Sequence, residues 1–337
     1  ASTAARKVFA SSERRVELDS AHELKTADAV AADLGPMTGA LMKLGQMASD
    51  LDDGLPDPLR LAQAQLRSEA PPMSGELAAG VIEAELGRPP DELFVEWDPD
   101  PIAAASIGQV HRAIALHPDT GDEIPVAVKV QYPGVDEAIT ADLKNASMLG
   151  TLLKQGFGGL DPDDMVAEIK ERLVEELDYR LEASNQAEFA DYYRDHPYIH
   201  VPEVVAEYST SRVLTSELVN GATWAEMRTW PQREQDLAAE TIFRFVFRSL
   251  YRMHAFNGDP HPGNYLFHGD GRVTFLDFGL VKHFTDVEMN TFASMVEAAA
   301  VDHDDARFRT ILEHAGMLMP DAPVETDAVG RYFERFY

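Results

Sequence analysis

Hydrophobic positions recur with helical spacing near both ends of the chain and with strand spacing between them. From residue 33 to 51, apolar residues return at steps of three and four, which predicts a helix. Residues 103–116 and 125–132 are apolar, strand-like runs on either side of a polar turn, and together they predict a hairpin. Helical spacing returns in three later stretches: 163–190, 235–256 and the residues after Lys282.

The order of these elements predicts an α+β protein in three parts. Residues 1–95 are helical in pattern and precede anything rich in strands, so we expect them to form an N-terminal helical extension. A strand-rich part is expected over 96–220 and a helix-rich part over 221–337, and this last part is short. Within the extension, Ser74 is expected to cap a helix that Gly87 ends.

Charge and cysteine content narrow the classes of function. The formal net charge is −29, which opposes binding to the phosphate backbone of nucleic acids. The absence of cysteine excludes disulfides and cysteine-ligated metals and fits a reducing compartment. No stretch reaches the roughly 18 apolar residues of a membrane-spanning helix. We therefore expect a cytoplasmic protein.

The segment NGDPHPGNYLFHGDGRVTFLDFG carries the most specific chemistry in the chain. Asp259 and Asn264 are five residues apart, and Asp277 begins a DFG triplet after a strand-like run. In phosphoryl transfer by kinases, a catalytic-loop Asp receives the substrate proton, an Asn five residues later holds Mg²⁺, and the DFG Asp holds metal against the phosphates. The spacing therefore predicts Asp259 as the catalytic residue and Asn264 and Asp277 as metal ligands.

Lys129, in the strand-like VAVK, is a candidate for contact with the α- and β-phosphates, and a carboxylate on the following helix would hold it. On a continuous helix over 163–190, Glu175, Asp178 and Glu182 would share one face, with Glu176 on another flank. Helical spacing alone does not select the partner of Lys129 among them. A solvent-exposed acidic face explains the same pattern equally well.

Before the lysine strand, where protein kinases have a glycine-rich phosphate loop, this chain has alanines. Ala103, Ala104, Ala105 and Ser106 stand there, and a Cβ disfavours positive φ, so this loop should be stiffer and should hold phosphates differently.

Six motifs together resemble the UbiB-type (AarF-domain, ADCK) family of atypical kinases: KLGQ, AAAS, VAVK, ELDYRLEA, NGDPHPGN and LDFG, in this order. The resemblance implies a bilobal protein-kinase-like fold, with the N-lobe over 96–220, the C-lobe over 221–337 and the helical extension added before them. It further implies that the extension occludes the place where a peptide substrate would dock. The residues that carry this occluding motif would be Lys43, Gly45 and Gln46, facing an acidic pair formed by Glu176 and Asp178.

The resemblance also selects Glu182 as the ion-pair partner of Lys129 and Ala103 to Ser106 as the nucleotide loop. It implies ATP or ADP and Mg²⁺ as cofactors, and a role in quinone or isoprenoid-lipid biosynthesis rather than protein phosphorylation. A lipid or quinone-precursor ligand and peripheral membrane contact would accompany that role. Two alternatives stay open: a small-molecule phosphotransferase similar to aminoglycoside or choline kinases, and a nucleotide-gated scaffold with negligible catalysis.

Overall fold

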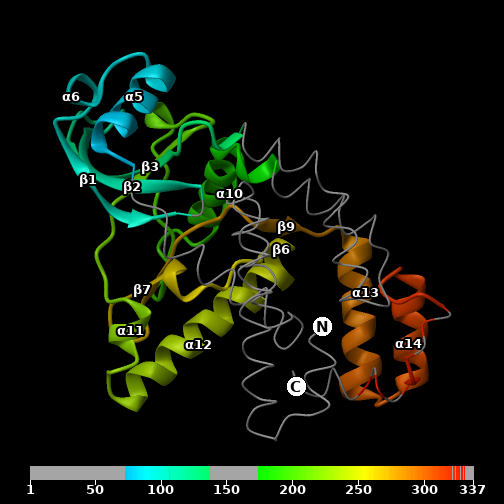
Figure 1. Cartoon of the computed structure of the whole chain (residues 1–337). Coiled ribbons are helices and arrows are strands. Elements are labelled where there is room, and N and C mark those ends of the chain that lie inside the picture. The colour runs from blue at the N-terminus through cyan, green and yellow to red at the C-terminus, as the bar shows by residue number, and fades with distance from the viewer. Residues whose placement is uncertain are drawn as a thin grey trace, which may run out of the picture. The chain divides into compact units, whose positions relative to one another are not determined.

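The computed structural model in Figure 1 describes residues 73–105, 107–136, 174–320, 322, 324–326, 328 and 330. The sequence predictions at Lys43, Gly45, Gln46 and Ser106 lie outside these residues. The chain divides into two compact units. Among the described residues, unit 1 comprises 73–105, 107–124, 128–136 and 174–177, and unit 2 comprises 125–127 and everything from 178 onward.

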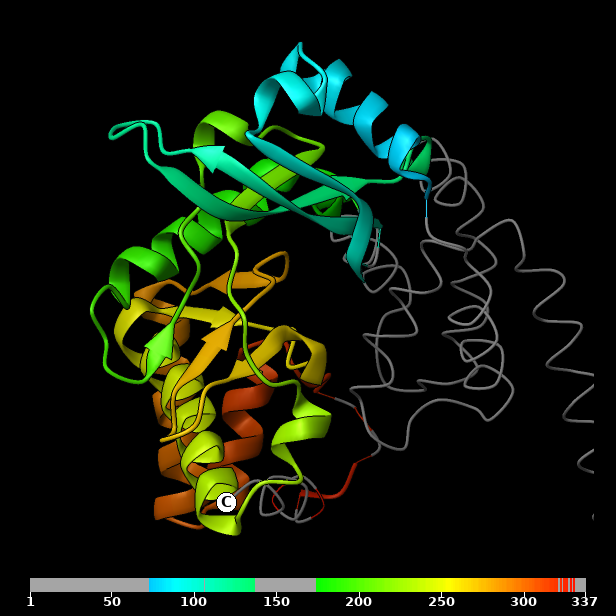
Figure 2. The ribbon, with the colours of Figure 1, turned by 90° about the vertical axis from the view of Figure 1, so that its left-hand side faces the viewer.

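Unit 1 begins with two helices, and the first confirms the predicted Ser74 cap and Gly87 stop. Helix α5 (Gly75–Leu86) has Ser74 as its N-cap, whose side chain accepts the N–H of Leu77, and ends at Gly87, which has φ of 75°. The short helix α6 (Pro90–Leu93) follows and starts with proline at its first position. Figure 2 shows both helices beside the sheet that comes next in the chain.

The predicted hairpin is confirmed, and a further strand precedes it. Strands β1 (Glu96–Ala104), β2 (Gly108–Leu116) and β3 (Glu123–Gln131) follow one another, and β1 pairs antiparallel with β2. The sheet order is β1-β2-β3-β5, and the part of β3 that lies next to β5 (Val213–Glu217) belongs to unit 2. Alternate residues of β3 are buried, as expected for a strand with one core-facing side.

The helix predicted over 163–190 is confirmed at residues 174–176 and from Tyr179 onward, but it is not continuous, because it breaks at Leu177 and Asp178. Helix α10 (Tyr179–Tyr192) begins only after Asp178, which is its N-cap with extended backbone at φ −113° and ψ 95°. The carboxylate of Asp178 accepts the N–H of Arg180, because an N-cap side chain satisfies a donor that the first helical turn leaves open. Glu175, Asp178 and Glu182 therefore do not share one helical face.

The apolar residues of this helix do not all face the core. Leu181, which fits the helical spacing of apolar residues in 163–190, is 47% exposed. The buried face of α10 consists instead of Tyr179, Glu182, Gln186 and Phe189. Because two of these four residues are polar, the spacing of apolar residues predicts a different buried face from the one that the structure has.

Unit 2 contains short strands. Parallel pairing joins β4 (Ile199–His200) to β8 (Val273–Phe275), which pairs antiparallel with β7 (Tyr265–Phe267). A separate ladder joins β6 (Ala255–Asn257) to β9 (Val281–His283). The strand-like run VPEVVAEY, residues 201–208, forms no strand: Val204 makes an isolated β-bridge and Ala206–Tyr208 is a 3-10 turn, η1.

The helices of unit 2 are α11 (Trp224–Met227), α12 (Gln232–Arg248), α13 (Asp286–Val296) and α14 (Asp305–His314). Helix α12 continues into the π-helical turn η2 (Ser249–Met253), α13 continues into η4 (Glu297–Val301), and the 3-10 turn η3 spans Pro262–Asn264. The sequence predicted a helix over 235–256, but β6 already begins at Ala255. His254 allows this sharp turn, because it takes the left-handed conformation with φ of 55°.

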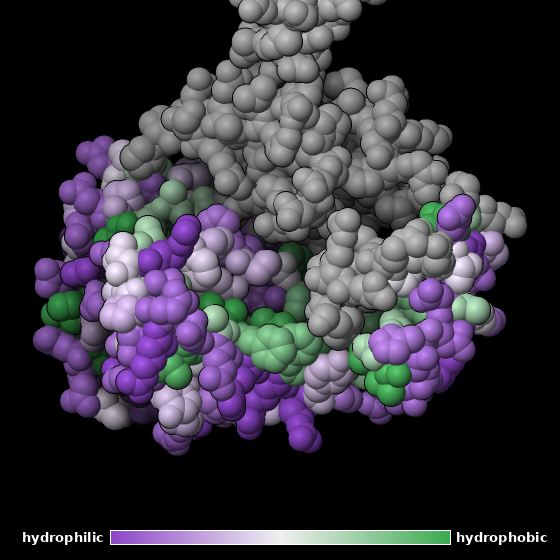
Figure 3. Space-filling view, turned by 90° about the horizontal axis from the view of Figure 1, so that it is seen from below, coloured by the Kyte–Doolittle hydropathy of each residue, from purple (hydrophilic) through white to green (hydrophobic). Residues whose placement is uncertain are grey.

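One aromatic core joins these elements. Phe189, Phe245, Phe275 and Phe278 lie in the same buried cluster, and the rings of Phe245 and Phe275 stack with centroids 3.7 Å apart. A smaller cluster holds α13 against α14, which lie side by side in Figure 1. Figure 3 shows apolar areas set among hydrophilic ones on one face of the molecule. Among the described residues, no helix has both the length and the apolar character needed to cross a membrane.

Candidate functional site

Two loops of unit 2 are held side by side by strand pairing at both of their ends. The first loop connects β6 to β7 and carries Asp259, and the second connects β8 to β9 and carries Asp277. At one end the N–H of Gly258 donates to the carbonyl of Leu280 at 2.7 Å. At the other, the N–H of Leu276 donates to the carbonyl of Asn264 at 2.8 Å. The predicted loop residues therefore meet in one region of unit 2.

The Asp259 loop is shaped by its own side chains. The Asp259 carboxylate accepts the N–H of His261 at 3.2 Å, and the imidazole Nδ1 of His261 accepts the N–H of Gly263 at 3.1 Å. The amide nitrogen of Asn264 donates to the carbonyl of Asp259 at 3.3 Å. These bonds close the five-residue span between Asp259 and Asn264, so both residues are presented by one compact turn. The spacing noted in the sequence therefore has a structural reason.

Asp277 has an unusual backbone. Its φ is 60°, in the left-handed region that non-glycine residues enter at a cost, although Asp is among those that tolerate it. Its carboxylate accepts the N–H of Gly279 at 3.1 Å, and its carbonyl accepts the side-chain amide of Asn257 at 3.0 Å. Such conformations persist where the surroundings fix them, and they cluster at functional sites.

Helix α10 packs directly on the DFG triplet. The side-chain amide of Asn185 donates to the carbonyl of Phe278 at 3.0 Å, and the ring of Phe189 lies 5.0 Å from that of Phe278. Glu182 stands one turn before Asn185 on the buried face of α10 and is only 6% exposed. A buried carboxylate needs polar partners, and Glu182 makes a polar contact. Glu182, the predicted ion-pair partner of Lys129, therefore lies on the helix that contacts the DFG triplet.

The donor chemistry of the two loops fits Mg²⁺. Asp259, Asn264 and Asp277 offer carboxylate and amide oxygens, which are the hard ligands that Mg²⁺ prefers, and Mg²⁺ in such sites takes its remaining ligands from phosphates and water. Because Asn264 uses its amide nitrogen as a donor toward Asp259, its amide oxygen is directed elsewhere. The described residues contain no group of three or more His, Cys, Asp or Glu side chains placed to hold a metal by themselves. The set therefore suits a metal that arrives with phosphate oxygens.

The other predicted site residues lie on separate elements. Lys129 is in β3, half-buried and on the same side of the strand as Gln131, whose amide donates to the carbonyl of Leu177 at 2.8 Å. Glu176 is in the short helical segment before that carbonyl, and Asp178 pairs with Arg180 at 3.0 Å. These contacts place the strand of Lys129 next to the chain that leads into α10.

The alanine loop is the end of β1 and the start of a tight hairpin. Ala103 and Ala104 pair with Val110 and Gln109 of β2, and the N–H of Ala105 donates to the carbonyl of Gly108 at 2.8 Å. Strand pairing rather than glycine flexibility therefore shapes this loop as far as Ala105.

Two residues near the DFG triplet were not singled out from the sequence: Asn185 and Asn257. Both are amides that donate to consecutive main-chain carbonyls, those of Phe278 and Asp277. Both occur within or beside motifs that the sequence displays, ELDYRLEASN and NGDPHPGN. Asn185 is only half-buried on α10, and no pattern in the sequence marks it out, whereas Asn257 opens the NGDPHPGN motif.

A family model and several known proteins match most of the chain. A family model described as the ABC1 atypical kinase-like domain matches residues 65–312. An aarF domain-containing protein kinase of the Arabidopsis thaliana chloroplast is 38% identical over 258 residues, which are 75% of this chain and 35% of that protein. The probable protein kinase UbiB of Marinobacter nauticus is 32% identical over 258 residues, 74% of this chain and 46% of that protein. The chain thus spans less than half the length of either relative.

Among solved structures, the complex of Rv3197 with erythromycin from Mycobacterium tuberculosis is similar, with a TM-score of 0.63 and 34% identity. The alignment covers 96% of this chain and 81% of Rv3197. The fold is therefore kinase-like, with mixed helix and sheet, as the sequence predicted. Sequence, fold and the arrangement of the two loops agree: the chain belongs to the ABC1 atypical kinase-like family, whose members include the aarF-domain and UbiB proteins.

Proposed function

We propose that this protein is an Mg²⁺-dependent, ATP-binding atypical kinase or ATPase. The observation that carries the proposal is the pairing of the Asp259 loop with the DFG loop at both ends, which presents Asp259, Asn264 and Asp277 together. When bound, Mg²⁺ would neutralise charge on the nucleotide phosphates. Asn264 and Asp277 would hold it, and Asp259 would orient the attacking hydroxyl or water.

In this proposal the remaining residues keep the roles that the family resemblance gives them. Lys129 contacts the phosphates and Glu182 is its ion-pair partner, while Ala103 to Ser106 form the nucleotide loop. Support for Glu182 comes from its burial on the face of α10 that contacts the DFG triplet. Lys43, Gly45 and Gln46, with Glu176 and Asp178, form the occluding motif, so protein phosphorylation is not the proposed reaction. Quinone or isoprenoid-lipid biosynthesis is the proposed process.

The decisive experiment replaces Asp277 by Asn. The substitution keeps the size of the side chain and removes the charge that would face the metal. We expect Mg²⁺-dependent ATP turnover to fall by about a hundredfold, in the range seen when a charge-stabilising group is removed from a transition state. Asp236→Asn, an exposed carboxylate on α12 that binds only Gln232 among the hydrogen bonds described, is the matched control. Unchanged Mg²⁺-dependent binding and turnover in Asp277→Asn would overturn the proposal.

The same assay separates the alternatives. A nucleotide-gated scaffold would bind ATP without releasing phosphate, whether or not lipid vesicles and quinone-like phenols are present. A small-molecule phosphotransferase would transfer phosphate to members of a panel of amino sugars and amino alcohols. Because the solved structure of Rv3197 is a complex with erythromycin, a macrolide belongs in that panel.

A further inference from the structure

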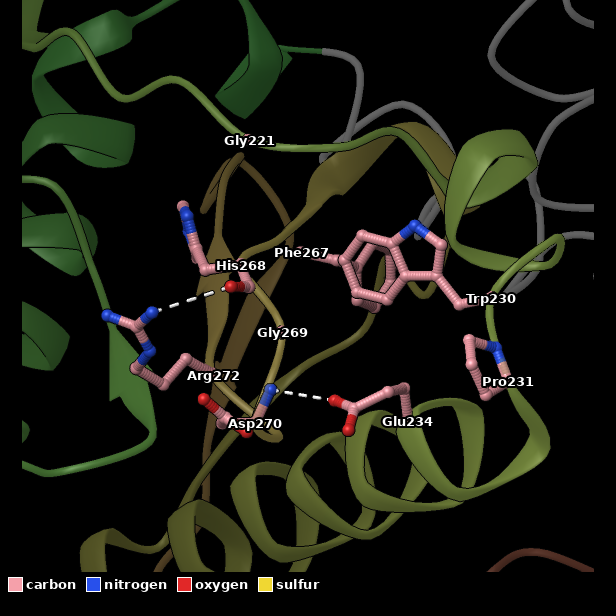
Figure 4. A pocket seen from close by; sticks show the side chains of 9 residues that line it. All are labelled: Gly221, Trp230, Pro231, Glu234, Phe267, His268, Gly269, Asp270 and Arg272. Carbon is pink, nitrogen blue, oxygen red and sulfur yellow. Dashed lines mark hydrogen bonds between the residues drawn. The ribbon is translucent and has the colours of Figure 1, made fainter.

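Unit 2 has an open pocket at the opposite end of β7 from Asn264. Its volume is about 610 Å³, within the range of small-molecule sites. Figure 4 shows its arrangement: Trp230 and Pro231 line one side, His268 and Arg272 the other, and Glu234 and Asp270 lie below. Strand β7 is three residues long and separates this pocket from the Asp259 loop, so the pocket is not part of the phosphate site.

The walls of the pocket are fixed by hydrogen bonds. The carboxylate of Glu234 accepts the N–H of Asp270 at 2.8 Å, and the hydroxyl of Thr241 donates to the carbonyl of Gly271 at 2.7 Å. These two bonds attach the turn between β7 and β8 to helix α12. On the other side, Ala222 exchanges two main-chain hydrogen bonds with Phe267. A preformed cavity of this kind binds ligands without a large ordering cost.

An aromatic surface forms one wall. The indole of Trp230 lies in front of the Phe267 ring in Figure 4, and Phe267 is itself packed against Trp224 with ring centroids 5.9 Å apart. Phe267 is 1% exposed, so the accessible face of this wall belongs to Trp230, which is half-buried. Indole is the strongest of the natural side chains in attracting cations to its ring face.

The charges around the pocket favour a cation as well. Glu234 and Asp270 bring two carboxylates, against the single guanidinium of Arg272. His268 adds no charge near neutral pH, because burial and then the charges of Arg272 and His200 lower its pKa. The N-terminus of α12 would attract an anion, but Glu234 in its first turn already offsets that field. The net charge of −29 further attracts cations to the surface.

We propose that this pocket binds an organic cation: a molecule with an apolar or aromatic body and a protonated or quaternary amine. The apolar body lies against Trp230 and Pro231, and the ammonium group lies toward Glu234 and Asp270. This site is separate from the proposed phosphate site, and its ligand is not a substrate of the reaction proposed above.

The test uses benzyltrimethylammonium as probe and the three tryptophan indole N–H signals in ¹⁵N NMR as the readout. Trp230→Phe assigns the Trp230 signal. We expect that signal to shift with saturation on titration, and benzyl alcohol, which keeps the ring without the charge, to bind about threefold to tenfold more weakly. Glu234→Gln keeps an acceptor for the Asp270 N–H, and it should weaken probe binding by a similar factor. Glu240→Gln, an exposed carboxylate farther along α12, is the matched control.

Three results would overturn the proposal. If benzyl alcohol bound as tightly as benzyltrimethylammonium, the pocket would recognise only the apolar ring and not the charge. Phenylacetate binding more tightly, and losing affinity in Arg272→Gln, would show an anion site. Failure of the Trp230 signal to shift while the three signals confirm the fold would show that the pocket is not a ligand site. Repeating the titration with Asp277→Asn makes this test independent of the proposed function, because probe binding should be unchanged in that variant.

Discussion

Asn185 and Asn257 bind consecutive carbonyl groups at the point where the DFG triplet takes its unusual backbone. Asn257 binds the carbonyl of Asp277, and Asn185 binds that of Phe278. A positive φ at Asp277 costs free energy, so it requires partners that fix it. The two amides therefore determine where the Asp277 carboxylate points, without contacting metal or nucleotide themselves in the proposed mechanism.

Asn185→Ala tests this positioning role. The carbonyl of Phe278 would lose its donor, and we expect the apparent Mg²⁺ affinity in ATP turnover to fall about tenfold, as for other residues that orient metal ligands. Gln186→Ala is the matched control, since Gln186 is the next residue of α10 and donates to the carbonyl of Pro202 instead. Both variants should lose stability in thermal unfolding through one hydrogen bond each, part-buried for Asn185 and buried for Gln186. An equal loss of Mg²⁺ affinity in both would show that Asn185 acts only through stability.

At the scale of elements, one ion pair connects two strands of unit 2. His200 of β4 and Glu217 of β5 are 3.1 Å apart between Nε2 and Oε2, and both side chains are partly exposed. The hydrogen bond to Glu217 raises the pKa of His200 above 6.5, and the hydrogen bond to His200 lowers the pKa of Glu217 below 4.5. Between pH 4.5 and pH 6.5, His200 is therefore protonated and Glu217 ionised, so the ion pair is fully formed.

The contribution of this ion pair to folding stability depends on pH in the direction that the two pKa shifts set. The His200 contribution is fully present below pH 6.5 and is lost as pH rises through the raised pKa of His200. The Glu217 contribution is present above pH 4.5 and is lost as pH falls through the lowered pKa of Glu217. We expect His200→Gln to lower the melting temperature at about pH 5.5 and to leave it nearly unchanged at about pH 8.5. Glu217→Gln should do the same, with the double variant no worse than either single one, and an equal loss at both pH values would contradict this.

The element scale also shows what the sequence could predict. The hairpin, the Ser74 cap and the Gly87 stop follow from local rules, and the structure has all three. The buried face of α10 does not, because it includes the polar residues Glu182 and Gln186, and the partner of Gln186 is the carbonyl of Pro202, outside the helix. Hydropathy counts such residues as exposed. The break in the helix at Asp178 could not be predicted either, because the sequence alone does not distinguish an aspartate that caps a helix from one that is exposed on its surface.

At the scale of the whole molecule, the sequence indicates which loops carry the candidate site but not what holds those loops together. Asp259, Asn264 and Asp277 could be proposed from the sequence because kinase chemistry requires these residue types at this spacing. The pairing of β6 with β9 and the amides that hold the DFG backbone depend on tertiary contacts over many residues. No local pattern records those contacts. The pocket beside Trp230 was missed for the same reason, since its walls come from three separate segments.

The hydrogen bonds around Asn257 have a consequence for how the protein ages in storage. Asn–Gly pairs deamidate readily, because glycine has no Cβ to keep its nitrogen away from the asparagine side chain. The chain has two such pairs, Asn220–Gly221 and Asn257–Gly258. At the second, the attacking nitrogen is bound to Leu280 and the side chain to Asp277, whereas both residues of the first are exposed.

Peptide mapping of stored, folded protein should therefore find aspartate at position 220 well before position 257. Denatured protein should lose the difference, since both pairs then have the same chemistry. Equal rates in the folded state would mean that the Asp259 loop opens often. The rate of deamidation at Asn257 thus reports how much of the time the Asp259 loop stays paired with the DFG loop.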